Sequence, residues 1–171
     1  MKPAQKKWLV LTAIIIITAL TRILPHPPNF TPIAAIGLFG AAHFTKKYWA
    51  VIIPTLALLL SDYAMGYTPN LSVYAAFAAI SLLGLLALRK VNFVNVASTS
   101  LLSSVLFFVI TNYFVWSGGR MYPPTTTGLV ACYTAAIPFF GNTISGDLFY
   151  SFFLFVGYHF LHKKFLIPNI A

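Results

Sequence analysis

The amino-acid sequence predicts an all-α membrane protein: six transmembrane helices, N-in/C-in, plus a re-entrant or interfacial helix before the last span. Three observations predict this fold class. Of the 171 residues, 59% are apolar and only 8% are charged, and the mean hydropathy is +0.84. An ordinary soluble domain carries about 25% charged residues, and a water-soluble fold of this length cannot bury so much apolar surface. Composition therefore excludes a cytosolic globular enzyme, a disordered tail and a disulfide scaffold, and indicates one integral membrane domain, residues 1–171.

The first three apolar segments follow one another closely. Residues 8–24 lack a small-x-small cleavage site, so this segment is expected to be a retained helix rather than a signal peptide. Residues 32–44 form a short segment in which Gly37 and Ala41 stand four apart. Small residues at this spacing favour close helix packing within the chain or docking of a partner subunit. Residues 48–63 contain Pro54, which is expected to kink the third helix.

The second half of the chain contains longer apolar segments. The fourth and fifth helices are expected over residues 71–88 and 96–116. A further apolar stretch, residues 128–140, is followed by Gly141 and Asn142, and the last helix is expected from about residue 145 to residue 162.

Basic residues predict the orientation of these segments. The chain has 11 Lys and Arg against two acids, and most of the basic residues flank the apolar segments in four clusters: Lys2/Lys6/Lys7, Lys46/Lys47, Arg89/Lys90 and Lys163/Lys164. The positive-inside rule places all four clusters in the cytoplasm, which gives six crossings with both termini inside. Residues 128–140 must then begin and end outside, as a re-entrant or surface-lying helix. Because the basic residues lie between apolar runs, they indicate membrane topology and lipid headgroups rather than nucleic acid.

This topology places the remaining four charges and a group of polar and aromatic side chains on the outer face, which predicts a substrate-binding site there. The candidate residues from this reasoning are Arg22, His26, Asn29, Asp62, Trp116, Arg120, Tyr122, Cys132, Asn142 and Asp147. The pocket is expected to have the first, third, fifth and last helices as its floor. Its roof is expected to be formed by the connections at residues 25–32, 67–70 and 117–124.

Asp62 is the most informative of these residues. It lies at the C-terminal end of a predicted helix, where the helix dipole disfavours a carboxylate. An acid without a partner beside hydrocarbon is more costly still. Asp62 is therefore expected to accept hydrogen bonds from Arg22, Arg120 or a neighbouring donor, either as a structural salt bridge or as part of a ligand site.

Other candidates each have two interpretations. Asp147 is expected in the first turn of the last helix, where an acid suits the dipole. Arg120 follows two glycines and precedes two prolines, so its loop is a lid over a polar ligand or an interfacial aromatic belt with Trp116 and Tyr122. Cys132 is a small packing residue, a nucleophile with His26 as base, or a contact for a soft metal or cobalt.

Several motifs are missing from the sequence. No metal-ligand spacing, Walker lysine motif, HExxH or GxSxG is present. No charge is expected in the middle of a span, so coupled secondary transport by this chain alone is not expected. No cofactor is predicted.

Motifs along nearly the whole chain resemble a family of small bacterial membrane proteins. The motifs are Arg22-Ile-Leu-Pro-His-Pro-Pro-Asn-Phe-Thr-Pro, Leu60-Ser-Asp62, Thr111-Asn112-Tyr113-Phe114-Val115-Trp116 and Asn142-Thr-Ile-Ser-Gly-Asp147. That family is similar to the substrate-binding S components of energy-coupling factor (ECF) vitamin transporters. The resemblance implies a multi-pass protein of the bacterial cytoplasmic membrane with a pocket for a small vitamin-like molecule, and it adds Asn112 to the site. It also implies a T component and ATPases as partners.

The first helix departs from the S-component pattern. S components often carry Ala-x-x-x-Ala on this helix for coupling, whereas residues 13–17 read Ala-Ile-Ile-Ile-Ile. A solitary member of the cobalamin type is therefore left open. Three functions remain at this point: a substrate-binding membrane subunit, a small membrane enzyme using Cys132 or the Asp62/Asp147 pair, and a ligand-free structural protein.

Overall fold

The structure is a computed structural model that describes residues 3–163, and within this range it contains six α-helices, one 3-10 helix and no strand. The elements in chain order are α1 (Pro3–Leu20), η1 (Thr21–Ile23), α2 (Ile33–His43), α3 (Lys47–Ala64), α4 (Leu71–Ala87), α5 (Phe93–Ser117) and α6 (Thr126–Leu161). The predicted all-α class is confirmed. Lys2 and Lys164 of the two terminal basic clusters lie outside the described residues.

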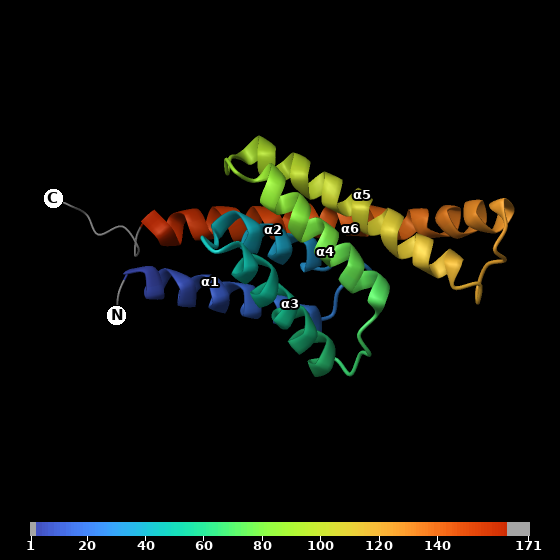
Figure 1. The fold of residues 1–171 in the computed structure, drawn as a ribbon, viewed down its shortest axis with the longest axis horizontal. Coiled ribbons are helices and arrows are strands. Elements are labelled where there is room, and N and C mark those ends of the chain that lie inside the picture. Colours follow the sequence, from blue (N-terminus) through green and yellow to red (C-terminus); the bar gives the residue numbers. More distant parts are fainter. Residues whose placement is uncertain (1–2, 164–171) are drawn as a thin grey trace.

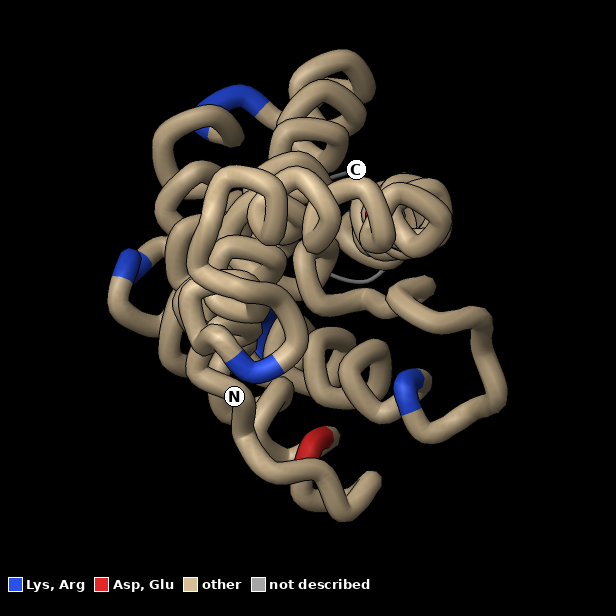
Figure 2. The backbone as a smooth tube through the Cα atoms, turned by 90° about the vertical axis from the view of Figure 1, so that its right-hand side faces the viewer, with Lys and Arg blue, Asp and Glu red and all other residues tan. Residues whose placement is uncertain are grey.

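The chain runs back and forth along the long axis of the molecule (Figure 1). The start of α1, the α2–α3 and α4–α5 connections and the end of α6 gather at one end, on the left of that view. These four places carry the basic clusters, and we call this the basic end. Figure 2, viewed from the right-hand side of Figure 1, shows how few backbone positions are Lys, Arg, Asp or Glu.

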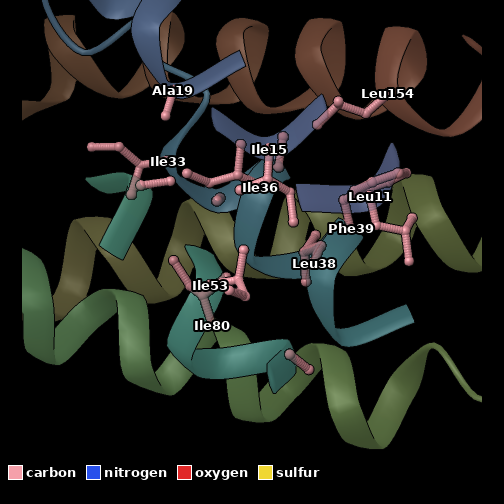
Figure 3. Close-up of a cluster of buried hydrophobic side chains, with 14 of the residues drawn as sticks. Leu11, Ile15, Ala19, Ile33, Ile36, Leu38, Phe39, Ile53, Ile80 and Leu154 are labelled. Atoms are coloured by element: carbon pink, nitrogen blue, oxygen red, sulfur yellow. The ribbon is translucent and has the colours of Figure 1, made fainter. Parts of the chain in front are cut away.

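Helix α2 is the centre of the fold. It packs against each of the other five α-helices, and every residue from Ile33 to Ala41 is buried. Figure 3 shows Ile33, Ile36, Leu38 and Phe39 among side chains from the surrounding helices. An apolar helix surrounded in this way takes its stability from packing on all sides rather than on one face.

Small residues let α2 approach its neighbours. A Cβ on Gly40 would lie 2.6 Å from Pro54 Cγ and 2.9 Å from the Ala50 carbonyl oxygen. A Cβ on Gly84 of α4 would lie 2.8 Å from the Ala41 Cβ. Internal packing, one of the two interpretations of the small residues in this segment, is therefore confirmed. The neighbouring helices cover α2 from Ile33 to Ala41, which includes Gly37 and Ala41.

Helix α6 contradicts the predicted re-entrant helix over residues 128–140. The chain forms one helix of 36 residues that continues through Pro138, Gly141 and Asn142. Proline lacks one N–H and costs about 3 kcal/mol inside a helix, but contacts with α5 hold both sides of this point. Tyr133 Oη donates to the Val109 carbonyl over 2.7 Å, and Phe108 stacks on both Tyr133 and Phe140.

Two of the described helices, α5 and α6, are long and apolar enough to cross a membrane. At 1.5 Å per residue the 11 residues of α2 span only about 16 Å, roughly half of a hydrocarbon core. Helix α4 is apolar but has 17 residues. Six α-helices are thus present in residues 3–163, whereas length and hydropathy qualify two of them as spans instead of the six predicted.

Candidate functional site

A cavity of about 1050 Å³ opens beside the α1–α2 and α3–α4 connections, away from the basic end. Its walls combine polar groups with apolar side chains. The lining residues are Arg22, Ile23, Leu24, Pro25, His26, Pro28, Asn29, Thr31, Ile33, Asp62, Met65, Gly66, Tyr67, Thr68, Asn70, Val73 and Phe107.

A buried ion pair forms the base of this cavity. Arg22 Nη1 donates to Asp62 Oδ1 over 2.7 Å and to Ser61 Oγ over 2.5 Å. Tyr74 Oη donates to the other carboxylate oxygen, Oδ2, over 2.7 Å. Arg22 is 8% exposed and Asp62 is 5% exposed. The predicted pairing of Asp62 is confirmed, with Arg22 as the cation.

The local sequence explains how these groups meet. Arg22 lies in η1, the 3-10 turn that continues α1. Helix α3 ends at Ala64, and Gly66 has φ 71°, a left-handed conformation that glycine adopts without strain. Asn70 then accepts from the Ser72 backbone N–H and caps α4. This tight connection brings Tyr74 of α4 to Asp62 of α3.

The segment between η1 and α2 forms one wall of the cavity, and α6 supports it from behind. Asn142 Nδ2 donates to the Pro28 carbonyl over 3.0 Å. A Cβ on Gly146 would lie 3.0 Å from both Phe30 Cα and the Thr31 backbone nitrogen, so a larger residue here requires this wall to shift by a few tenths of an ångström. Asn29 takes φ 65°, a left-handed conformation that asparagine tolerates. Asn142 therefore acts on the site through this wall and does not line the cavity.

Four of the candidate residues meet in the cavity: Arg22, His26, Asn29 and Asp62. Two of the three predicted roof segments, residues 25–32 and 67–70, contribute lining residues. The predicted floor is partly wrong, because Ile33 of α2 and Val73 of α4 line the cavity and no lining residue comes from α6.

The third predicted roof segment, residues 117–124, contributes no lining residue. Helices α5 and α6 form a hairpin that extends beyond the other helices, and this connection lies at its tip (Figure 1). Arg120 is exposed there and Tyr122 half-buried, while Trp116 Nε1 donates to the Thr125 carbonyl over 3.2 Å. Because the hairpin extends past the other helices, residues 117–124 at its tip do not form the predicted lid over this cavity.

Asn112 and Cys132 also lie on the hairpin. The Cys132 side chain is buried, and its Sγ lies 3.5 Å from the Asn112 carbonyl oxygen. Asn112 Nδ2 donates to the Phe108 carbonyl over 2.7 Å. Neither residue lines the cavity that contains His26, so the structure favours the packing role of Cys132.

Asp147 is not in a first helical turn, which corrects the prediction. It lies deep inside α6, 3% exposed, whereas Thr125 caps the start of that helix. Ser104 Oγ donates to Asp147 Oδ2 over 2.6 Å. The sequence predicted no charged residue type in the middle of a span, whereas Asp147 lies inside α6, one of the two helices long and apolar enough to cross a membrane. Asp62 and Asp147 belong to separate hydrogen-bond networks and form no dyad.

Sequence reasoning missed Tyr74, Ser61 and Phe107. A signal existed for Tyr74, because Asp62 and Tyr74 stand at similar distances from the middle of the α3–α4 connection, and an antiparallel helix pair brings such positions together. Among the described residues no group of three or more His, Cys, Asp or Glu could hold a metal ion.

Fold and site together define an all-α protein with two helices able to cross a membrane and a cavity built on a buried ion pair. A model described as a family of unknown function, DUF6580, matches residues 2–170, and the chain belongs to this family. No curated protein and no solved structure shows significant similarity to the chain.

Proposed function

We propose that this protein is a membrane-embedded, S-component-like binding protein for uptake of a small vitamin-like molecule, which enters the cavity from the outer face. The observation that carries the proposal is the large cavity over the buried Arg22–Asp62 pair, on the side away from the basic end. Buried charge at the base of a partly apolar concavity is typical of ligand sites.

Surface composition supports a membrane location. Large apolar side chains are exposed on several helices, among them Ile17 (66%), Leu86 (68%) and Phe93 (75%). Exposed apolar surface on this scale needs lipid or protein to cover it. The short helix α2 causes no conflict, because other helices surround it and its ends need no lipid contact. In the proposed orientation the basic end faces the cytoplasm of a bacterial inner membrane, with both termini inside.

The cavity suits a vitamin-sized molecule. Small-molecule sites have volumes of roughly 300–1,000 Å³ with a few placed polar groups among apolar walls. At about 1050 Å³ this cavity is slightly larger than that range, and its apolar lining includes Ile33, Val73 and Phe107. The groups at the bottom of the cavity suit binding rather than catalysis, because Arg22 and Tyr74 donate hydrogen bonds to both oxygens of Asp62.

Partners are part of the proposal. An ECF T component with its ATPases would supply energy for release of the cargo into the cell. Because the first helix lacks the Ala-x-x-x-Ala pattern and α2 is buried, any such module must contact another surface. The solitary arrangement needs no such module, and in that case lipid alone surrounds the protein.

A thermal-shift screen of vitamins and cofactors on the protein in lipid nanodiscs tests the proposal. A ligand at 100 times its Kd stabilises the folded state by about 2.7 kcal/mol, so a binder raises the Tm. His26→Ala and Asn29→Gly should reduce this ligand-induced shift and leave the Tm without ligand unchanged. Arg120→Ala, on the hairpin tip, is the matched control and should keep the full shift. A screen without any shift, or variants that lower the ligand-free Tm equally, would contradict the proposal.

A further inference from the structure

The base of the cavity has spare hydrogen-bond donors but few spare acceptors. Asp62 accepts from Arg22 through one oxygen and from Tyr74 through the other. Of the three guanidinium nitrogens of Arg22, only Nη1 donates to another described residue. The buried Nε has no partner in the described part of the chain, so the Nε–Nη2 edge is left without an acceptor.

One neighbouring side chain, that of Asn70, reinforces this imbalance. The Asn70 side-chain oxygen already accepts from the Ser72 N–H and hydroxyl, which leaves the amide NH₂ group. His26 does not add to the imbalance, because its Nδ1 donates to the Leu24 carbonyl oxygen over 2.6 Å and the other ring nitrogen of a neutral imidazole is an acceptor. Asp62 is the one acid among the residues that line the cavity. A cationic ligand would therefore meet Arg22 without a free carboxylate.

We infer that the ligand carries a carboxylate, which accepts hydrogen bonds from the Nε–Nη2 edge of Arg22, and that its apolar body lies against Ile33, Val73 and Phe107. This inference rests on the proposed function and names its substrate class. Guanidinium and carboxylate match in geometry through two parallel hydrogen bonds. A single negative charge fits better than a phosphate, because Asp62 already balances part of the Arg22 charge.

Matched acid and amide pairs test this inference on the full chain in nanodiscs. The probes are nicotinate with nicotinamide, indole-3-acetate with indole-3-acetamide, and biotin with biotinamide, each measured by thermal shift and by isothermal titration. The wild-type protein should bind the acid of a recognised pair about tenfold to a hundredfold more tightly than its amide, as expected for hydrogen bonds to a charged group.

Two variants separate recognition from folding. Arg22→Lys keeps the charge beside Asp62 but removes the planar donor edge, and it should reduce the preference for the acid by about tenfold. The double variant Arg22→Gln/Asp62→Asn keeps polar side chains without buried charge and should lose the preference while it remains folded. Arg120→Lys is the matched control on the hairpin tip and should keep the full preference.

Each outcome has a defined meaning. Equal binding of acids and amides, or an acid preference that survives both Arg22 variants, overturns the inference and leaves small-molecule binding intact. If no probe binds and the vitamin screen also gives no shift, the proposed function fails together with the inference.

Discussion

The two acids of this chain occupy contrasting regions. Asp62 closes the base of the cavity and pairs with Arg22. Asp147 lies in the α5–α6 interface and accepts from Ser104, while the Ser100 hydroxyl lies 2.7 Å from that of Ser151 nearby. Both carboxyl groups are almost inaccessible to water, yet within residues 3–163 only Asp62 has a cation beside it. Burial alone therefore does not mark the site, whereas burial with a charged partner at a cavity does.

The largest effect is expected at the ion pair. Arg22→Gln leaves the Asp62 carboxylate buried without its cation and should lower the free energy of unfolding by about 3–5 kcal/mol. Arg22→Gln/Asp62→Asn removes both charges and should recover most of this loss. Unfolding in detergent by denaturant titration measures both values. A double variant that is no more stable than the single one would show that the two charges do not compensate each other.

Replacing a glycine by alanine should destabilise the protein in the central helix α2 but not in the protruding α5–α6 hairpin. Gly40→Ala places a Cβ against Pro54 and Ala50, so overpacking should cost about 1–3 kcal/mol. Gly141 of α6 has no atom within 4 Å of an added Cβ, and Gly141→Ala should be neutral or stabilise by up to about 1 kcal/mol. The same denaturant titration compares them, and equal destabilisation by both variants would contradict the packing described for α2.

Of the two acids, Asp147 is expected to show the smaller effect. An amide keeps the shape of the carboxyl group, and its oxygen accepts from Ser104 equally well, so Asp147→Asn should change the free energy of unfolding by less than about 1 kcal/mol. Asp62→Asn should cost more, about 1–3 kcal/mol, because it removes the charged partner of Arg22. If Asp147→Asn proves the more costly of the two, the contrast between the two acids is wrong.

Much of the helix content was predictable, because apolar runs and the residues that end them are local signals. The boundaries of α3 (Lys47–Ala64) and α4 (Leu71–Ala87) lie within a residue of the predicted ones. The predicted end of a helix before residue 145 was wrong. It rested on Pro138 and Gly141, which usually interrupt a helix but lie inside α6. The long contact with α5 outweighs that local preference, and a single sequence does not show such contacts.

Prediction of the site succeeded at Asp62, because a carboxylate at the C-terminal end of a helix is unfavourable without a hydrogen-bond donor or cation beside it. Asp62 required a partner, and Arg22 lay at the same end of the bundle. Arg120 was an equal candidate in the sequence, and only the length of the α5–α6 hairpin removes it from the cavity. Tyr74 was missed because a tyrosine in an apolar helix resembles a packing residue until the neighbouring helix is placed beside it.

The central claim, that this cavity holds a small molecule, has one direct measurement. Thr68→Trp places a large side chain into the cavity from its rim, and Ser117→Trp makes a matched change at the end of α5, outside the cavity. Small molecules released from each protein, purified from cells in lipid nanodiscs, are identified by mass spectrometry. The account predicts a compound enriched in the wild-type protein and in Ser117→Trp but absent from Thr68→Trp. The same compounds in all three proteins, or no enriched compound in the wild-type protein, would contradict it.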